Sequence, residues 1–507
     1  MLASSAREPT NYQREEFLGD SVLKLLATLE LLSRHLGYPE SILSKMKDHI
    51  VSNSRLARAA IRTGLDQFII TKPFTGSKWR IPTETGDIDS KASQSREIST
   101  KILADVVEAM IGATFLEGGY SKAVKCLRIF LPEEPWNDFD EIFSILHNVY
   151  TQRPQSSRFV HDVEQLLGYE FGLKSLLIES VIHASYPNPG ISGPYERLEF
   201  VGDAVLDNIV TVAAYNSEPS IPVARLHLLR SALVNADLLG YLCLRHNVEK
   251  TNVIIHSEDP RNIQTVEEEA PFYLWQALRQ CSPTIMQAQQ ACLARLQEYG
   301  DAINSALTIG DHHPWSLLAQ LEPPKPYSDI IESILGAIYI DSHGDLTKCS
   351  AFLERIGLMS YMKKLLTSDV ALLHPKEELG QLSNQAEVQY TMSKMGEGHE
   401  QRLVCNVIVG GRTIATVNDG LRLLETQTRA AEVACKVLRD ERLRETKGLH
   451  DASREHLEIN SGSSSSGQSE IDDDGHDIVS EDDMSWEGEG QKFDGNGSDE
   501  YMTANEL

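Results

Sequence analysis

A five-residue acidic pattern occurs twice in this chain of 507 residues and limits its possible folds more than any other feature. It reads Glu-Phe-Leu-Gly-Asp at residues 16–20 and Glu-Phe-Val-Gly-Asp at residues 199–203. In a helix, positions i and i+3 or i+4 share one face, so each half of the chain can direct four carboxylates to one point. Each copy is followed by a second acidic pair at a spacing of three: Asp105 with Glu108, then Asp329 with Glu332.

Four unpaired carboxylates at one point repel one another, so the arrangement calls for cations among them. Hard cations such as Mg²⁺ take oxygen ligands, usually carboxylates together with substrate phosphates. We therefore predict two metal-dependent phosphoryl-transfer sites in one chain. The predicted catalytic and metal-binding ligands are Glu16, Asp20, Asp105 and Glu108 in the first site, and Glu199, Asp203, Asp329 and Glu332 in the second.

A single acidic pair on a helix face is usually solvated, and this simpler reading must be weighed first. Here the acids stand within apolar sequence, such as Phe17 and Leu18 in the first copy. Each copy also places a glycine mid-helix, Gly19 and Gly202, although glycine there costs about 1 kcal/mol against alanine. We expect these glycines to mark close backbone approach between the two copies. The repetition of the whole block argues against coincidence.

The repeat extends beyond the acids: residues 50–56 parallel 232–238, and residues 101–113 parallel 325–337. Together with the Glu-Phe-Leu-Gly-Asp helix, these blocks resemble the ribonuclease III family. Two tandem copies followed by a small RNA-binding module resemble the C-terminal half of Dicer proteins. Residues 71–79 and the long insert in the second copy are similar to fungal Dicer-like proteins. The resemblance covers about residues 1–440 and implies that Met1 falls inside a motif, so we expect a fragment or a truncated gene model.

The resemblance implies a mainly α fold with two tandem all-helical domains that form an internal pseudo-dimer. It further implies that each site uses two Mg²⁺ ions, with Mn²⁺ as a substitute, to cut one strand of double-stranded RNA. The products would be short duplexes with 3′ overhangs for RNA silencing, with silencing-complex proteins as partners. Lys101 and Lys325 lie four residues before Asp105 and Asp329. They could contact the scissile phosphate or form ordinary helix ion pairs, and the sequence leaves both readings open.

Residues 374–440 read as helix, strands and helix, and resemble a divergent double-stranded RNA-binding domain of α-β-β-β-α order. The resemblance implies RNA contacts by Gln381, His399 and Arg429. The lysine cluster expected at the start of the last helix is replaced by Thr-Gln-Thr-Arg at residues 426–429, and the module holds 8 basic and 9 acidic residues. Because phosphate contacts dominate RNA affinity, weak RNA binding and a protein-docking role are both open.

The net charge of −27 is unusual for a chain that binds nucleic acid. From Asp451 onward there are 17 acidic and 2 basic residues, a net of −15, which leaves −12 for the rest. The 7 cysteines without a Cys-x-x-Cys motif suit a reducing compartment, cytoplasm or nucleus. The sequence contains no apolar run of about 18 residues, so it predicts no membrane span.

Pattern changes along the chain predict five segments. They are a first ribonuclease III domain over 1–131, a linker over 132–158, a second domain over 159–366 with a helical insert at about 251–322, the RNA-binding module over 374–440 and a disordered acidic tail over 451–507. Helices are expected over 22–36, 102–115, 141–150 and 176–185. A non-catalytic RNA-binding scaffold and a protein-interaction module are the competing functions. Loss of one or more of the predicted carboxylate ligands would indicate a non-catalytic scaffold. All eight predicted ligands are present.

Overall fold

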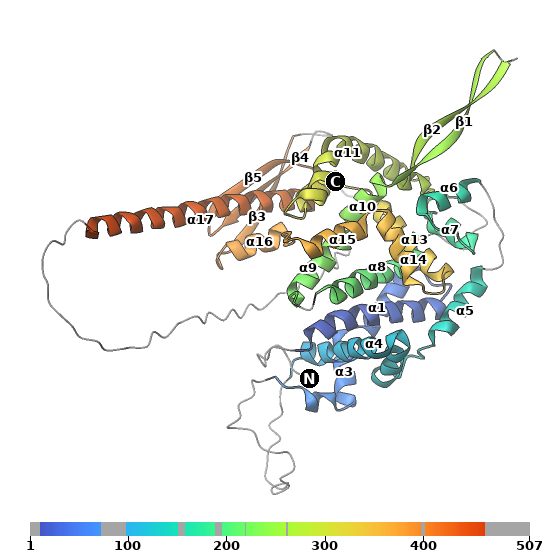
Figure 1. Ribbon diagram of the computed structural model, residues 1–507, viewed down its shortest axis with the longest axis horizontal. Helices are drawn as coiled ribbons and strands as arrows, with labels where there is room; N and C mark the ends of the chain where they lie inside the picture. Colours follow the sequence, from blue (N-terminus) through green and yellow to red (C-terminus); the bar gives the residue numbers. More distant parts are fainter. Residues whose placement is uncertain are drawn as a thin grey trace, which may run out of the picture. The chain divides into compact units, whose positions relative to one another are not determined.

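The computed structural model describes residues 11–71, 98–150, 158–187, 195–218, 220–259, 262–396 and 401–461. It divides into two compact units, residues 1–442 and 443–507. Of the second unit, the described residues are the end of one helix. The first unit contains two helical domains and a small α+β module (Figure 1), which confirms the predicted mainly α fold.

The first helical domain is built around two long helices, α1 (Gln13–Arg34) and α4 (Thr100–Phe130), which pack along each other. Most residues of α1 from Phe17 onward are buried, because apolar side chains surround the helix on nearly every face. Ser99 begins α4 by accepting a hydrogen bond from the Ile102 N–H, and Gly118 and Gly119 interrupt its helical backbone. The shorter elements are α2 (Glu40–Ile50), α3 (Asn53–Arg62) and the 3-10 turn η2 (Leu65–Phe68).

The second helical domain repeats this order of helices. Its long pair is α8 (Glu196–Ser217) and α13 (Pro326–Asp341), which correspond to α1 and α4 and also pack along each other. The other helices are α6 (Arg158–Leu167), α7 (Lys174–Ser180), α9 (Val223–Leu233), α10 (Ala236–Arg245), α14 (Leu346–Arg355) and α15 (Leu358–Thr367). The helix expected over 176–185 is present as α7, but it ends at Ser180.

The two helical domains share one hydrophobic core, in which α1 packs against α8 (Figure 1). Asn208 on α8 joins the halves, because it accepts from the Tyr120 hydroxyl at 2.6 Å and donates to the Ser21 hydroxyl at 3.2 Å. The segment predicted as a linker contains α5 (Phe139–Tyr150), which contacts both α1 and α13. The two halves therefore pair within the chain.

The insert of the second domain is only partly helical, so the prediction of a helical insert over 251–322 is wrong in its first part. The insert begins with a long antiparallel hairpin of β1 (Asn247–Asp259) and β2 (Asn262–Tyr273). The β-branched run at 253–255 favours a strand, and the helical periodicity of the residues after 273 obscured that signal. The 3-10 turn η4 (Leu274–Ala277), α11 (Pro283–Ile309) and α12 (Trp315–Leu321) complete the insert.

The small module has the predicted α-β-β-β-α order. It consists of α16 (Pro375–Leu382), a three-stranded antiparallel sheet in the order β3-β4-β5, and α17 (Leu423–Ser461). The strands are β3 (Val388–Met395), β4 (Arg402–Val409) and β5 (Arg412–Gly420). Gly410 and Gly411 form the turn between β4 and β5 with φ of 56° and 80°, a conformation that glycine adopts readily.

Helix α17 runs past the module and ends at Ser461. Residues 451–461 are therefore helical, which corrects the prediction of a disordered tail for that stretch. The remainder of the predicted tail, 462–507, lies outside the described residues. Among the helices that the structure describes, none has the length and apolar character needed to cross a bilayer.

Candidate active site

The first acidic centre lies where α1 meets α4. Glu16 on α1 and Asp105 and Glu108 on α4 each place a carboxylate oxygen within 4.8 Å of the other two. Asp105 and Glu108 are buried and Glu16 is half-buried. The spacing of three puts both α4 acids on the helix face that contacts α1. Three of the four predicted ligands of the first site thus meet at one point.

The second acidic centre repeats this arrangement where α8 meets α13. Glu199 on α8 joins Asp329 and Glu332 on α13, again with oxygens within 4.8 Å of one another. Because the two helix pairs correspond in sequence order, the same three positions of the repeat form both centres.

Each mid-helix glycine lets two helices of the same domain approach each other. The prediction that these glycines mark close approach between the two copies is therefore wrong. A Cβ atom added at Gly19 would overlap the carbonyl oxygen of Glu108, and one at Gly202 would overlap that of Glu332. Gly112 and Gly336 face back toward α1 and α8 in the same way. The absence of side chains at these positions lets the backbones approach closely, and this approach places the carboxylates of facing helices in one cluster.

Lys101 and Lys325 form ion pairs at the centres. The Lys101 Nζ lies 2.7 Å from Asp105 Oδ2 and 4.0 Å from Glu16 Oε1. The Lys325 Nζ lies 2.9 Å from Asp329 Oδ2 and 3.2 Å from Glu199 Oε1. The pairs are therefore more than i,i+4 contacts along one helix, because each ammonium group also reaches the acid on the facing helix.

Asp20 and Asp203, the remaining predicted ligands, are not members of these three-carboxylate clusters among the described residues. Asp20 instead pairs with Arg230 on α9, and Asp203 pairs with Lys24 on α1. Helical spacing correctly placed both aspartates one turn from Glu16 and Glu199, but it could not show that each meets a cation of the other domain.

Burial and mutual repulsion act against ionisation at the second centre. Burial, and then the charge of Asp329, raise the pKa of Glu199 to about 7. Burial, and then the charges of Asp203 and Glu199, raise the pKa of Glu332 well above its ordinary value. A nearby cation favours the ionised form of such groups. Three carboxylate oxygens from two facing helices are a donor set that suits a hard divalent cation, so the residues present fit one.

A model of the ribonuclease III domain matches this chain twice, over residues 13–119 and 196–343, which together make up about half of it. The chain belongs to the ribonuclease III family. Each ribonuclease III domain contains one of the two acidic centres. A model of the double-stranded RNA-binding domain of Dicer-like protein 2 matches residues 368–464.

Curated relatives agree with the domain matches. The chain is 41% identical to Dicer-like protein 2 of Coccidioides immitis (strain RS) over 445 residues, which cover 87% of this chain and 31% of the relative. It is 39% identical to Dicer-like protein 2 of Cryphonectria parasitica over 87% of this chain and 32% of the relative. For Dicer-like protein 2 of Pyricularia oryzae the identity is 38%, over 85% of this chain and 30% of the relative. The chain thus spans about a third of the length of these relatives.

Two tyrosines at the centres of the ribonuclease III domains were missed by the sequence analysis. Tyr195, directly before α8, donates a hydrogen bond to Asp329 Oδ2 at 3.0 Å. Tyr12 precedes α1 at the equivalent position, and burial followed by the charges of Asp105 and Glu16 raises its pKa. The signal was present in the sequence, because a tyrosine stands four residues before Glu16 and four before Glu199.

The predicted RNA contacts of the small module have different surroundings. Gln381 is exposed near the end of α16. Arg429 is held by acids of its own module, because it donates to Glu425 Oε1 at 2.8 Å and to Asp419 Oδ1 at 2.9 Å. His399 lies outside the described residues. Of these three, Gln381 has a side chain open to a ligand.

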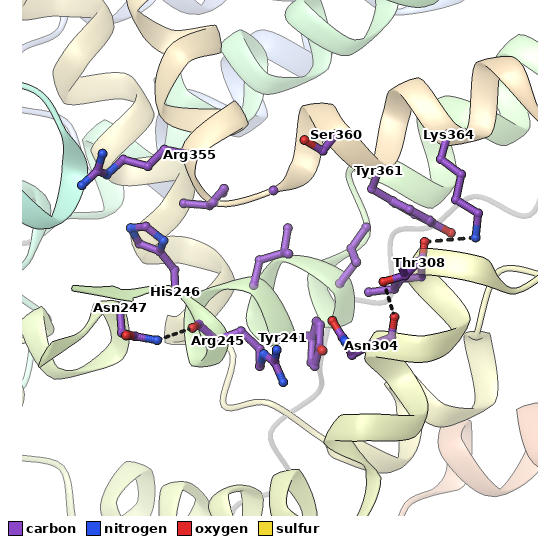
Figure 2. A pocket seen from close by; sticks show the side chains of 15 residues that line it. Tyr241, Arg245, His246, Asn247, Asn304, Thr308, Arg355, Ser360, Tyr361 and Lys364 are labelled. Atoms are coloured by element: carbon purple, nitrogen blue, oxygen red, sulfur yellow. Dashed lines mark hydrogen bonds between the residues drawn. The ribbon is translucent and has the colours of Figure 1, made fainter. Parts of the chain in front are cut away.

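A cavity of about 480 Å³ lies between α10, α11 and α15, and Figure 2 shows the side chains that line it. Two of its basic residues, Lys364 and Arg355, are already engaged with backbone carbonyl groups. Lys364 donates to carbonyl oxygens at the end of α11, including that of Gly310 at 2.7 Å, and Arg355 donates to that of Leu166 at 2.9 Å. The described lining includes none of the eight predicted ligands, so we assign this cavity no catalytic role.

The raised pKa of Glu199 predicts how stability depends on pH without metal. Glu199 binds its proton more tightly in the folded protein than in the unfolded chain, where the pKa of a glutamate is about 4.3. Its contribution to stability is therefore present below that value and is lost as the pH rises through about 7. In chelator, we expect the Tm of the protein to fall more between about pH 5 and pH 8 than the Tm of Glu199→Gln.

Mg²⁺ should oppose this loss, because metal ligands must be deprotonated. The rise in Tm on adding Mg²⁺ should therefore be larger at the higher pH. Thermal unfolding of both proteins followed by circular dichroism checks the prediction. Identical pH profiles in chelator for the two proteins would contradict it.

Proposed function

We propose that this chain is the nuclease part of a Dicer-type endoribonuclease that hydrolyses both strands of double-stranded RNA. One observation carries the proposal: two equivalent centres of three carboxylates occur in two ribonuclease III domains that pair within one chain. In this proposal each centre cuts one strand, and the offset between the cuts leaves short 3′ overhangs. The products enter RNA silencing in the cytoplasm or nucleus, with silencing-complex proteins as partners.

The residues of each centre have separable roles in this mechanism. Glu16, Asp105 and Glu108 would hold Mg²⁺ in the first centre, with Asp20 one turn along α1 as a further ligand, and the equivalent acids would do so in the second. Two ions at each centre, if bound there, would supply positive charge to the phosphate and would lower the pKa of water. Lys101 Nζ, 2.7 Å from Asp105, would donate to a phosphate oxygen of the substrate. Burial of Asp105 and Glu108 limits the access of bulk water.

Incubation with long duplex RNA tests this function directly. We expect short double-stranded products with Mg²⁺ or Mn²⁺ and none with chelator. Duplex DNA of the same sequence should remain intact, because RNA duplexes are recognised by their A-form shape and 2′-hydroxyl groups. Duplex RNA that binds but is never cut in the presence of either metal would instead favour the non-catalytic scaffold.

The RNA-binding module should assist cutting mainly at higher salt. Arg429 is hydrogen-bonded to acidic residues, and the module has 8 basic against 9 acidic residues. We therefore expect the module to make few phosphate contacts. A chain shortened to end at Leu373 should cut at about 50 mM salt nearly as fast as the full chain and lose more activity than it at about 200 mM. The boundary must follow Leu372, because Ala371 N–H donates to the Asp311 carbonyl at 2.8 Å and the Leu372 carbonyl accepts from Trp315 at 3.2 Å. Complete loss of cutting at low salt in a folded shortened chain would contradict the prediction.

A further inference from the structure

Asp20 and Asp203 are each held by a cation from the other ribonuclease III domain. Arg230 Nη1 on α9 lies 3.0 Å from Asp20 Oδ2 on α1, and Lys24 Nζ on α1 lies 3.0 Å from Asp203 Oδ2 on α8. The side chains of the two cations are only 20% and 25% exposed, whereas those of the two aspartates are 46% and 42% exposed. Each carboxylate is thus held on one side by the opposite domain and is accessible on the other.

The cations are fixed by contacts beyond the ion pairs. The Arg230 guanidinium lies over the Phe17 ring at 5.0 Å from its centroid, and its Nε is 3.8 Å from the buried Asp207. In the first domain, the Nζ of Lys47 on α2 lies over the Phe200 ring, 5.5 Å from its centroid. The phenylalanine of each repeated acidic motif therefore carries a cation of the other domain on its ring face.

The two aspartates lie close to the acidic centres. Asp20 lies one turn after Glu16 on α1, and Asp203 lies one turn after Glu199 on α8. A change in the position of either aspartate therefore changes the field in its own centre.

We propose that the two domains exchange positioning residues: Arg230 of the second domain orients Asp20 for the first centre, and Lys24 of the first domain orients Asp203 for the second. This inference rests on the proposed function, because it assigns each cation to one strand cut. Partners that hold a carboxylate ligand commonly control the affinity and activity of a metal site. Pairing of the domains then completes each centre, in addition to joining the two halves.

Strand-specific cutting distinguishes this role from a general effect on the interface. With a duplex labelled on both strands, Arg230→Gln should slow the cutting of one strand by about 10–100-fold. This should be the strand whose cutting Glu108→Ala slows, although Arg230 lies in the second domain. Lys24→Gln should slow the opposite strand, the one that Glu332→Ala slows. Arg230→Lys and Lys24→Arg keep the positive charge. They should therefore cut the affected strand at most of the original rate.

Arg14→Gln is the matched control. Arg14 joins the same two domains through the carbonyl oxygens of Tyr215 and Ile221. Because it holds backbone and neither aspartate in these contacts, its replacement should slow both strands to the same extent. Equal slowing of both strands by Arg230→Gln, or slowing of the strand opposite to the expected one, would overturn the positioning role.

Thermal unfolding in chelator gives a readout that does not require cutting. If Arg230 and Asp20 act as a pair, the loss in Tm of Arg230→Gln/Asp20→Asn should be smaller than the sum of the two single losses. Additive losses would overturn the pairing. If the unmodified chain cuts neither strand, the proposed function and the positioning role both fail, whereas non-additive losses would still establish the cross-domain pair.

Discussion

Replacing Glu108 by alanine should turn this chain into an enzyme that nicks one strand of a duplex, and Glu332→Ala should make it nick the other. Each glutamate belongs to one three-carboxylate centre, so its loss removes a proposed metal ligand from that centre alone. Loss of several kcal/mol of transition-state stabilisation corresponds to roughly 10²–10³-fold slower cutting of the affected strand. The other strand should be cut at nearly the original rate, because its centre keeps all of its acids.

A duplex with a different label on each strand, resolved on a denaturing gel, measures both rates at once. The variant with both replacements should cut neither strand and should still bind RNA. Glu117→Ala is a suitable control, because Glu117 lies on the same helix as Glu108 and its side chain is 71% exposed. If either single variant stopped cutting of both strands while it remained folded, the assignment of one centre to each strand would be wrong.

Glu108 and Glu332 are better targets for this test than Asp20 and Asp203. The aspartates pair with cations of the opposite domain, so their replacement also changes the domain interface. A reduced rate on both strands in an Asp20 variant would therefore not show by itself which centre had failed.

Gly19→Ala and Gly202→Ala should each destabilise the protein severely, with an expected loss of at least about 3 kcal/mol in the free energy of unfolding. A single methyl group at either position overlaps a backbone carbonyl oxygen, and neither helix can move aside without separating the acids of its centre. Alanine is thus already too large, because the contact lies between two backbones within one domain.

Denaturant unfolding followed by circular dichroism measures this effect. Gly37→Ala is the matched control, because a Cβ atom there meets nothing within 4 Å, and its stability should change by less than about 1 kcal/mol. If Gly19→Ala were as stable as the unmodified protein, the close approach of α1 to α4 would be disproved.

The repeat in the sequence was sufficient to predict that two acidic centres occur, whereas the internal pairing of two helical domains followed from the resemblance to the ribonuclease III family. Helical spacing places Asp105 and Glu108 on one face whatever the rest of the chain does, and buried acids within apolar sequence require a compensating cation. The order of the small module also followed from local pattern, because alternation and the Gly410-Gly411 turn are properties of neighbouring residues.

The tertiary structure decided which distant groups meet. The partner of Gly19 is the Glu108 carbonyl within its own domain, and the partner of Asp20 is Arg230, more than two hundred residues away. The hairpin at 247–273 likewise depends on pairing between two segments, because the β-branched run at 253–255 does not by itself specify its partner strand. Periodicity determines which side of an element a residue occupies, because the backbone geometry of one helix or strand is local. The group that a residue contacts on a neighbouring element depends on how the elements pack. It cannot be inferred from the sequence of a single element.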